Sequence, residues 1–386
     1  MPLPTDPWGA PLAPHPDAAL YEHCGLHDFT DDPLYSVLCR LIARSPDLLA
    51  LHDQAPPTQR RAVLLLAALH HCVMRAGPGH PGLPAWFGSV GGQRSPQDPA
   101  LPQALAEFAQ AHASALRSLL GHQRTQTNET GRCAVLRPAL DAIARRHPGR
   151  PLALFDFGAS AGLNLTVDRY RIHYRHAGQT HATGPADAPW PALHGQVVGT
   201  PPEGLFEPPR WHIAERCGTD LAPVDLHDRE ATDWLRACLW PSDAARRERL
   251  DMALAVARNV TLPVVAAEDG LGVLEGWLAT LPVHTLPVLF NTWVLAYFTP
   301  AMLAAHRERV HALVQQRRLL WLSAEDAPRM AATTGLQPPT HPVPGIAHTA
   351  PTSHTFWTLT EPCPTGVRHT LLARSHPHGA WLEWLA

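Results

Sequence analysis

The chain contains no lysine, and all 31 of its basic side chains are arginine. This absence excludes chemistry that depends on a lysine amine, such as Schiff-base enzymes, P-loop NTPases and protein kinases. No stretch of 18 consecutive apolar residues occurs, so we expect no membrane span. The seven cysteines are scattered and form no Cys-x-x-C pair, which favours reduced thiols and a cytoplasmic location.

Two further classes of partner lack a sequence signal. The net charge is −3, and the arginines form no basic stripe with interleaved aromatic residues, so we expect no nucleic-acid partner. The 25 histidines are numerous but scattered, and no His-Glu-x-x-His spacing occurs. We therefore expect no metal site.

Composition and hydrophobic periodicity along the 386-residue chain predict an N-terminal arm and two domains. Residues 1–16 are rich in proline and lack the features of a signal peptide, so we expect a flexible arm. Residues 17–148 show helical periodicity and no series of strands. The best helical segments there are Asp32–Ala43, Gln59–Ala76, Leu101–His122 and Gly131–Arg146.

Residues 149–386 alternate short apolar runs with helical stretches, which predicts an α/β domain. The expected strands are Leu152–Phe157, Trp211–Asp220, Leu262–Ala267, Thr285–Asn291, Arg318–Ser323, Thr352–Leu359 and Arg368–Ser375. No helix separates the last two, so they should form an antiparallel hairpin. We thus predict a Rossmann-like, mostly parallel seven-stranded sheet, as in class I methyltransferases, with an insertion at about 171–210 that forms a flap.

The segment LALFDFGASAGLNL, Leu152–Leu165, predicts a buried strand, a turn of small residues and the start of a helix. Such a turn lets a ligand approach the backbone, and free helix N–H groups favour polar or anionic ligand groups. A carboxylate inside the strand, Asp156, is costly unless it is paired or used. A glycine-containing turn without a ligand is the plainer alternative.

Two chemistries use this geometry. Read as Asp-x-Gly-x-Ser-x-Gly, the segment resembles motif I of the S-adenosylmethionine (SAM) methyltransferases, with Ser160 in place of a glycine. Read as Gly-x-Ser-x-Gly, it is a nucleophile elbow, for which Asp269 and His376 follow in the right order. In a hydrolase several strands precede the elbow, whereas here the preceding region is helical. The order of the chain therefore favours the methyltransferase.

Three further segments, taken with the motif above, carry a resemblance to a bacterial family. They are QTNETGR (126–132), ERCGTDLAPVDL (215–226) and LLARSHPHGAWLEW (371–384). With FDFGASAGLNLTVDRY (155–170), they resemble the family called domain of unknown function 2332 over nearly the whole chain. The resemblance implies a methyltransferase-like fold but no established activity.

On the methyltransferase reading, SAM is the expected cofactor. Small residues of the turn should line its methionine part, and Arg132 should bind its carboxylate. Acids at the ends of the first three strands should meet the amino group, the ribose and the adenine, respectively. The predicted cofactor-binding residues are Asp156, Gly158, Ala159, Ser160, Gly162, Asp220, Asp269 and Arg132.

The substrate side rests on polar residues around the same turn. We predict substrate contacts from Gln126, Asn128, Asn291 and Trp293. We predict bases in Glu129, Asp168 and Tyr170. The alternatives are a helix cap at Thr127 or Asn128 for the first patch, and an internal salt bridge with a packed tyrosine for residues 168–170.

Together these features predict a SAM-dependent methyltransferase that acts on a small-molecule acceptor. The alternatives are a serine hydrolase that uses Ser160, and a non-catalytic protein that binds SAM or a partner.

Overall fold

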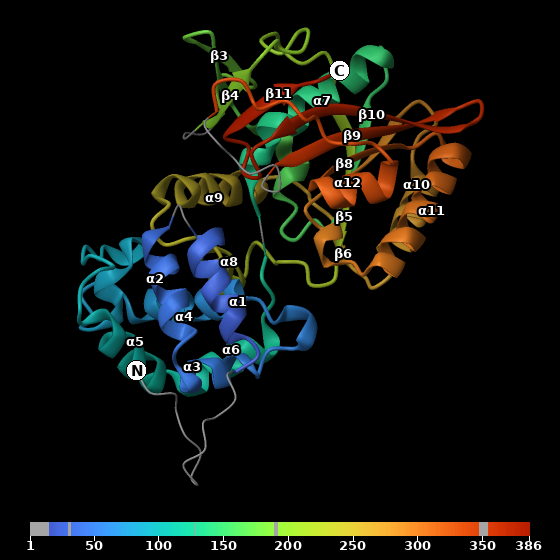
Figure 1. The fold of residues 1–386 in the computed structure, drawn as a ribbon. Helices are drawn as coiled ribbons and strands as arrows, with labels where there is room; N and C mark the ends of the chain where they lie inside the picture. The colour runs from blue at the N-terminus through green and yellow to red at the C-terminus, as the bar shows by residue number, and fades with distance from the viewer. Residues whose placement is uncertain (1–14, 30–31, 127, 189–191, 347–353) are drawn as a thin grey trace. The chain divides into compact units, whose positions relative to one another are not determined.

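The computed structural model describes residues 15–29, 32–126, 128–188, 192–346 and 354–386. It divides the chain into two compact units, coloured along the chain in Figure 1. The helical unit comprises Met1–Thr127 with Arg229–Arg247, and the sheet unit comprises Asn128–Asp228 with Glu248–Ala386. The division corrects the predicted boundary at residue 148 by about twenty residues. The predicted arm falls almost wholly outside the described residues.

The helical unit confirms the helical prediction for the first part of the chain. The expected helix over 101–122 is broken at His112, where φ is −105°. Residues 229–247 return to this unit from beyond the first strands of the sheet. The helices are α1 (Ala18–His23), α2 (Pro33–Ile42), α3 (Pro46–His52), α4 (Ala62–Ala76), α5 (Leu101–Ala111), α6 (Ala113–His122) and α8 (Arg229–Ala237), and α9 (Ala244–Ala257) crosses the boundary between units.

The sheet unit is an α/β fold built on one mixed sheet of eleven strands in the order β3-β2-β4-β11-β10-β9-β8-β7-β1-β5-β6. Most neighbouring strands are parallel. The strands are β1 (Leu152–Phe157), β2 (Ile172–His176), β3 (Gln179–Thr183), β4 (Leu193–Val198), β5 (Ile213–Asp220), β6 (Val264–Ala266), β7 (Leu286–Thr292), β8 (Leu320–Glu325), β9 (Thr355–Cys363), β10 (Gly366–Ser375) and β11 (Trp381–Trp384). All seven predicted strands are present, although residues 352–353 lie outside the described part, and β9 and β10 form the predicted hairpin.

The predicted flap at 171–210 is wrong. Instead, the segment supplies β2, β3 and β4, which extend the same sheet. Strand β11, at the end of the chain, joins them because it pairs antiparallel with β10 and parallel with β4. The short strand β2 places Ile172 and Tyr174 on its buried face, with exposed or half-buried residues between them.

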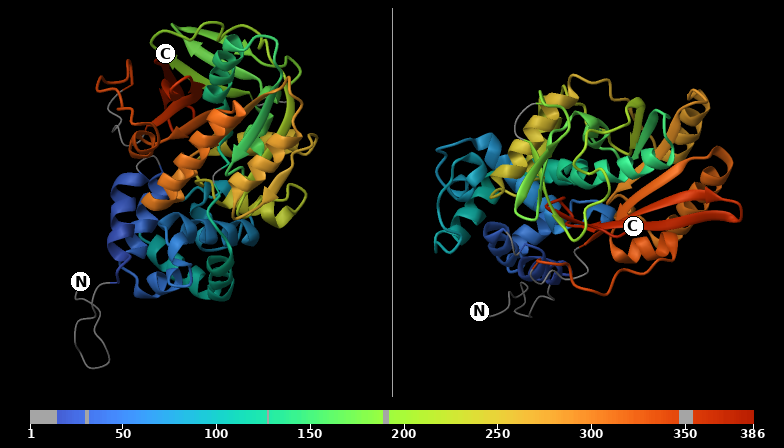
Figure 2. Two further views of the ribbon diagram at one scale, coloured as in Figure 1. Left: turned by 90° about the vertical axis from the view of Figure 1, so that its right-hand side faces the viewer. Right: turned by 90° about the horizontal axis from the view of Figure 1, so that it is seen from above.

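The parallel part of the sheet, β6-β5-β1-β7-β8, is wound by crossover helices. Helices α10 (Gly270–Thr280) and α11 (Pro300–Arg317) cover one face, where their leucines pack against Phe155, Leu289 and Trp321 (Figure 2). After β1 the chain first forms β2, β3 and β4 at the far end of the sheet, then adds β5 and β6 on one side of β1, and β7 and β8 on the other. The winding therefore reverses between β1 and β7, and ligands bind at such reversals in open α/β sheets.

Candidate functional site

The turn after β1 has left-handed backbone at three positions: φ is 84° at Gly158, 51° at Ser160 and 72° at Gly162. A Cβ at Gly158 would collide with Val294, the residue of the β7 loop that packs over the turn. The expected α-helix does not follow. A short 3₁₀ helix, Leu163–Arg169, leads directly into β2.

The backbone amides of this turn all donate within the protein, which corrects the expectation of free N–H groups. The amides of Gly158 and Ala159 donate to the carbonyl of Thr219 at 2.8 and 3.0 Å. The amide of Gly162 donates to the carbonyl of Ala159 at 2.7 Å. Side-chain oxygens from two other segments accept the remaining two amides, those of Ser160 and Ala161.

Asp220 accepts the first of these. Its Oδ2 receives the amide of Ser160 at 2.9 Å, and its Oδ1 receives the amide of Ala222 at the same distance. This contact confirms the expected strand order and the position of Asp220 beside the glycine turn. Because each carboxylate oxygen has two acceptor positions, Asp220 keeps capacity for ligand hydroxyls.

Asn128 connects the segment before α7 (Cys133–Arg146) to the same turn. Its Nδ2 donates to Ser160 Oγ at 2.7 Å, and its Oδ1 accepts the amide of Ala161 at 3.2 Å. The side chain is thus held by the loop that was predicted to bind the methionine part of SAM. Gln126 belongs to the helical unit, and the alternative cap Thr127 lies outside the described residues.

Glu129 is 3% exposed, and an arginine, a histidine and a backbone amide lie close to its carboxylate. Its Oε1 caps the 3₁₀ turn through the amide of Gly131 at 2.9 Å. Arg249 lies 3.7 Å from Oε1, and His378 Nδ1 lies 3.4 Å from Oε2. The capping alternative is therefore present, but at Glu129. The nearby histidine, which the sequence reasoning missed, comes from the C-terminal motif.

The segments QTNETGR (126–132) and LLARSHPHGAWLEW (371–384) meet at two glycines. A Cβ at Gly131 would overlap the carbonyl of His378, and a Cβ at Gly379 would overlap the carbonyl of Gly131. The two backbones therefore touch, which only glycine allows. This contact brings residues about 250 positions apart into one cluster.

Arg132 and Asp156 form the buried centre of this cluster. Arg132 is 4% exposed, and it donates from Nε to the carbonyl of Pro377 at 2.9 Å and from Nη1 to Thr292 Oγ1 at 3.2 Å. Burial raises the pKa of the Asp156 carboxyl well above its usual value, and the charge of Asp220 raises it further, whereas Arg132 opposes both. Such perturbed groups at the carboxyl edge of a sheet mark candidate functional sites.

Glu325, at the end of β8, is a site residue that the sequence reasoning missed. Its Oε1 accepts from Asn291 Nδ2 at 2.8 Å and from the amides of Val294 and Leu295 at 3.1 Å. Its Oε2 has no hydrogen-bond partner among the described residues. Burial raises the pKa of this carboxyl to about 7, the range of a general base at neutral pH.

The two predicted substrate residues on β7 have partners within the protein. Asn291 is 1% exposed, and its Oδ1 accepts from Trp321 Nε1 at 2.7 Å while its amide orients Glu325. Trp293 has a φ of 60° and donates from Nε1 to Thr355 Oγ1 at 2.8 Å. Asn291 is therefore a positioning residue, whereas half-buried Trp293 keeps part of its ring accessible.

Three other predicted site residues make structural contacts. Asp168 pairs with Arg216 at 2.8 Å, and the Tyr170 hydroxyl donates to the carbonyl of Leu163 at 2.8 Å. Asp269 caps α10 and pairs with Arg309 at 2.7 Å on the surface. These contacts favour the salt-bridge alternative for residues 168–170. They also give Asp269 two structural partners, while its adenine role and its place in a hydrolase triad stay predictions.

The described residues contain neither a metal-binding cluster nor a membrane-spanning helix. Within these ranges, no group of three or more His, Cys, Asp or Glu side chains is arranged to hold a metal ion. None of the helices in the described part is long and apolar enough to cross a bilayer.

Fold and site together define an α/β protein with buried acids at the carboxyl edge of a mixed sheet. The chain belongs to the family described as "Uncharacterized protein conserved in bacteria (DUF2332)", whose model matches residues 18–384. This match confirms the family resemblance that the sequence motifs predicted. No curated protein and no solved structure matches the chain.

Proposed function

We propose that the chain is a SAM-dependent methyltransferase that acts on a small-molecule acceptor. The observation that carries the proposal is the cluster of Asp156, Asp220 and Glu325 at the carboxyl edge of β1, β5 and β8, beside the point where the winding of the sheet reverses. Order and direction of the five parallel strands agree with the expected arrangement, whereas the extra strands and the missing helix after β1 depart from it.

The residues present fit SAM on one side better than on the other. Asp220 keeps acceptor positions suited to ribose hydroxyls, as expected of an acid at the end of the second strand. The amides of the glycine turn are already used, so the methionine carboxylate must be bound by side chains. Bound SAM would supply an electrophilic methyl group on a sulfonium.

The chain's own residues then have three tasks. Asp220 orients the ribose, and Arg132 holds the backbone at Thr292 and Pro377 in place. Glu325, whose buried Oε2 has no hydrogen-bond partner among the described residues and whose pKa is raised to about 7, accepts the proton that the substrate loses. Glu129 and His378 form a second pair that is able to move a proton at this edge.

Thermal unfolding of the full chain with S-adenosylhomocysteine tests the proposal, with NAD as the matched adenosine control. Ligand at a hundredfold over its dissociation constant should stabilise the fold by about 2.7 kcal/mol. NAD should have no effect. The absence of a shift at millimolar S-adenosylhomocysteine would contradict the proposal, and binding without methyl transfer to any small acceptor would favour the non-catalytic alternative.

One observation favours the serine hydrolase as a second candidate. Ser160 has a φ of 51°, and a strained turn is typical of a nucleophile elbow. Against it, the expected acid Asp269 is paired with Arg309. Stoichiometric labelling by a fluorophosphonate that is lost in Ser160→Ala would establish the hydrolase instead.

A further inference from the structure

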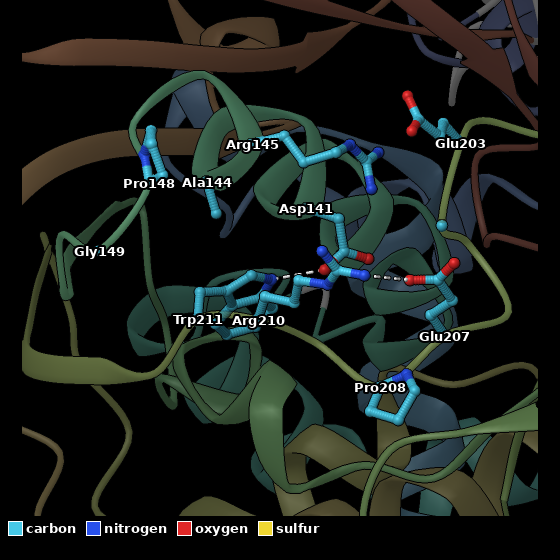
Figure 3. Close-up of a pocket in the computed structure, with 11 residues that line it drawn as sticks. Asp141, Ala144, Arg145, Pro148, Gly149, Glu203, Glu207, Pro208, Arg210 and Trp211 are labelled. Atoms are coloured by element: carbon cyan, nitrogen blue, oxygen red, sulfur yellow. Dashed lines mark hydrogen bonds and ion pairs between the residues drawn. The ribbon is translucent and has the colours of Figure 1, made fainter.

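A pocket lies at the opposite edge of the sheet from the acids described above. Its volume is about 370 Å³, and its lining comes from the end of α7 and from the segment that enters β5 (Figure 3). Gly149 lies just before β1, and Trp211 lies just before β5, so both belong to the amino ends of these strands. The candidate methyl-transfer site is at their carboxyl ends.

The floor of this pocket is a buried carboxylate. Asp141 is 6% exposed, and its Oδ1 accepts from Trp211 Nε1 at 2.5 Å. Its Oδ2 makes no hydrogen bond with any described residue, and Arg137 Nε is 3.8 Å away. A buried carboxylate oxygen without a donor is costly, so the pocket favours a ligand that brings an N–H donor.

The rim of the pocket carries charge of both signs. Glu207 and Arg210 pair with each other at 3.1 Å, so they neutralise one another. Arg145 has no hydrogen bond or ion pair within 4 Å among the described residues, although its guanidinium lies against Gly204. Figure 3 shows the Asp141 carboxylate between Arg145 and the Glu207–Arg210 pair.

Apart from Glu203 and the glycines, the remaining lining is apolar, with the indole of Trp211 as its largest surface. The other apolar contributors are Ala144, Pro148 and Pro208. A pocket of a few hundred Å³ with apolar walls and a few converging polar groups is typical of a small-molecule site.

We infer that this pocket binds a free α-amino acid with an apolar side chain. The ligand ammonium donates to Asp141 Oδ2, the ligand carboxylate accepts from Arg145, and the side chain lies along Trp211. A zwitterion gives Asp141 Oδ2, which has an ion pair with Arg137 but no hydrogen bond, an N–H donor, and it gives Arg145 an anionic partner. A simple amine leaves the guanidinium without a partner, and a simple acid places a second negative charge against Asp141.

Calorimetric titration of the full chain with three related probes tests this inference. L-Phenylalanine carries both charges, phenethylamine lacks the carboxylate, and 3-phenylpropanoate lacks the ammonium; L-leucine serves as a second amino acid. We expect at least one amino acid to bind, and both analogues of phenylalanine to bind about tenfold more weakly or not at all.

Variants locate the binding. Arg145→Gln should weaken amino-acid binding about tenfold, and Asp141→Asn should do the same. Arg146→Gln is the matched control, because the neighbouring arginine on the same helix pairs with Glu361 at 2.9 Å and does not line the pocket. No binding of either amino acid, equal binding of the analogues, or unchanged affinity in Arg145→Gln would overturn the inference. None of these outcomes depends on methyl transfer.

Discussion

The two units each bury a carboxylate, and the contrast between them separates structure from function. In the helical unit, Asp32 is fully buried and both of its oxygens are used: Oδ1 caps α2 through the amide of Tyr35 at 2.9 Å, and Oδ2 accepts from Ser242 Oγ at 2.5 Å. In the sheet unit, Glu325 is 1% exposed, one oxygen accepts three donors, and the other has no hydrogen bond within the described chain.

The surroundings of the two acids differ as well. Asp32 lies at the start of α2, whose residues Leu34, Tyr35 and Leu38 belong to the apolar core, as expected of a cap that stabilises a helix start. Glu325 shares its region with Arg132 and Asp326, whose charges act on its pKa in opposite directions. A buried acid that has all its donors supports the fold. One that keeps an oxygen without a donor and lies among charges is a candidate for chemistry.

The largest expected effect comes from Asp220, which combines both kinds of role. Asp220→Ala leaves the amides of Ser160 and Ala222 without acceptors, so we expect a loss of about 2–4 kcal/mol in the free energy of unfolding. A residue that only ended a strand would instead leave the free energy of unfolding almost unchanged. Chemical denaturation of both proteins decides between these values, and a loss under about 1 kcal/mol would contradict the anchoring role.

Glu325 should make stability depend on pH. Its pKa is raised from 4.5 to about 7, so the native state keeps a proton that the unfolded chain releases across this window. The free energy of unfolding therefore falls as pH rises from 4.5 to 7. Glu325→Gln cannot ionise, and we expect it to be about 1–3 kcal/mol more stable than the natural protein at pH 8 and similar to it at pH 4.5.

Urea denaturation at the two pH values checks this prediction. The raised pKa of Asp156 has the same sign, so some pH dependence should remain in the variant. An identical stability difference between natural protein and variant at both pH values would show that Glu325 does not titrate in the window.

Asp32→Ala is the counterpart in the helical unit. Loss of the α2 cap should destabilise the protein by about 1–2 kcal/mol. Binding of S-adenosylhomocysteine to the folded variant should not change. If Asp32→Ala weakened the binding of S-adenosylhomocysteine as much as Asp220→Ala does in the same assay, the comparison between the units would fail.

The smallest effect is expected at Ser160. Ser160→Gly relieves the left-handed backbone at φ 51° but loses the hydrogen bond from Asn128, so the two effects should cancel to within about 1 kcal/mol. Thermal unfolding measures the sum. A larger loss would mean that Asn128 depends on this hydroxyl for its position.

The sequence predicted the elements whose signals are local. Strand β1 has the predicted bounds, Leu152–Phe157, because its apolar run ends at a glycine turn. Helix α2 begins after Asp32 with proline at its first position, which is a local start signal. Features that depend on distant partners were not predictable: β2 to β4 join the sheet only through β11, and residues 229–247 return to the helical unit.

The candidate site follows the same division. Asp156 and Asp220 were predictable because an acid at the end of a buried strand is unusual, and the same signal at the end of β8 points to Glu325. His378 was not, because its approach to Glu129 depends on the contact between Gly131 and Gly379. The sequence also could not predict that the amides of Ser160 and Ala161 donate within the protein, because their acceptors lie at the end of β5 and before α7.

Hydrogen–deuterium exchange of the full chain with and without S-adenosylhomocysteine tests most directly the claim that the carboxyl edge of β1, β5 and β8 is the ligand site. We expect slower exchange in peptides covering 156–165, 217–224 and 292–296, because a bound ligand stabilises the segments that hold it. Peptides covering 141–149 and 203–211, which line the pocket proposed to bind an amino acid, should exchange at unchanged rates. Binding that leaves the first set unchanged, or that protects only the second, would contradict the account.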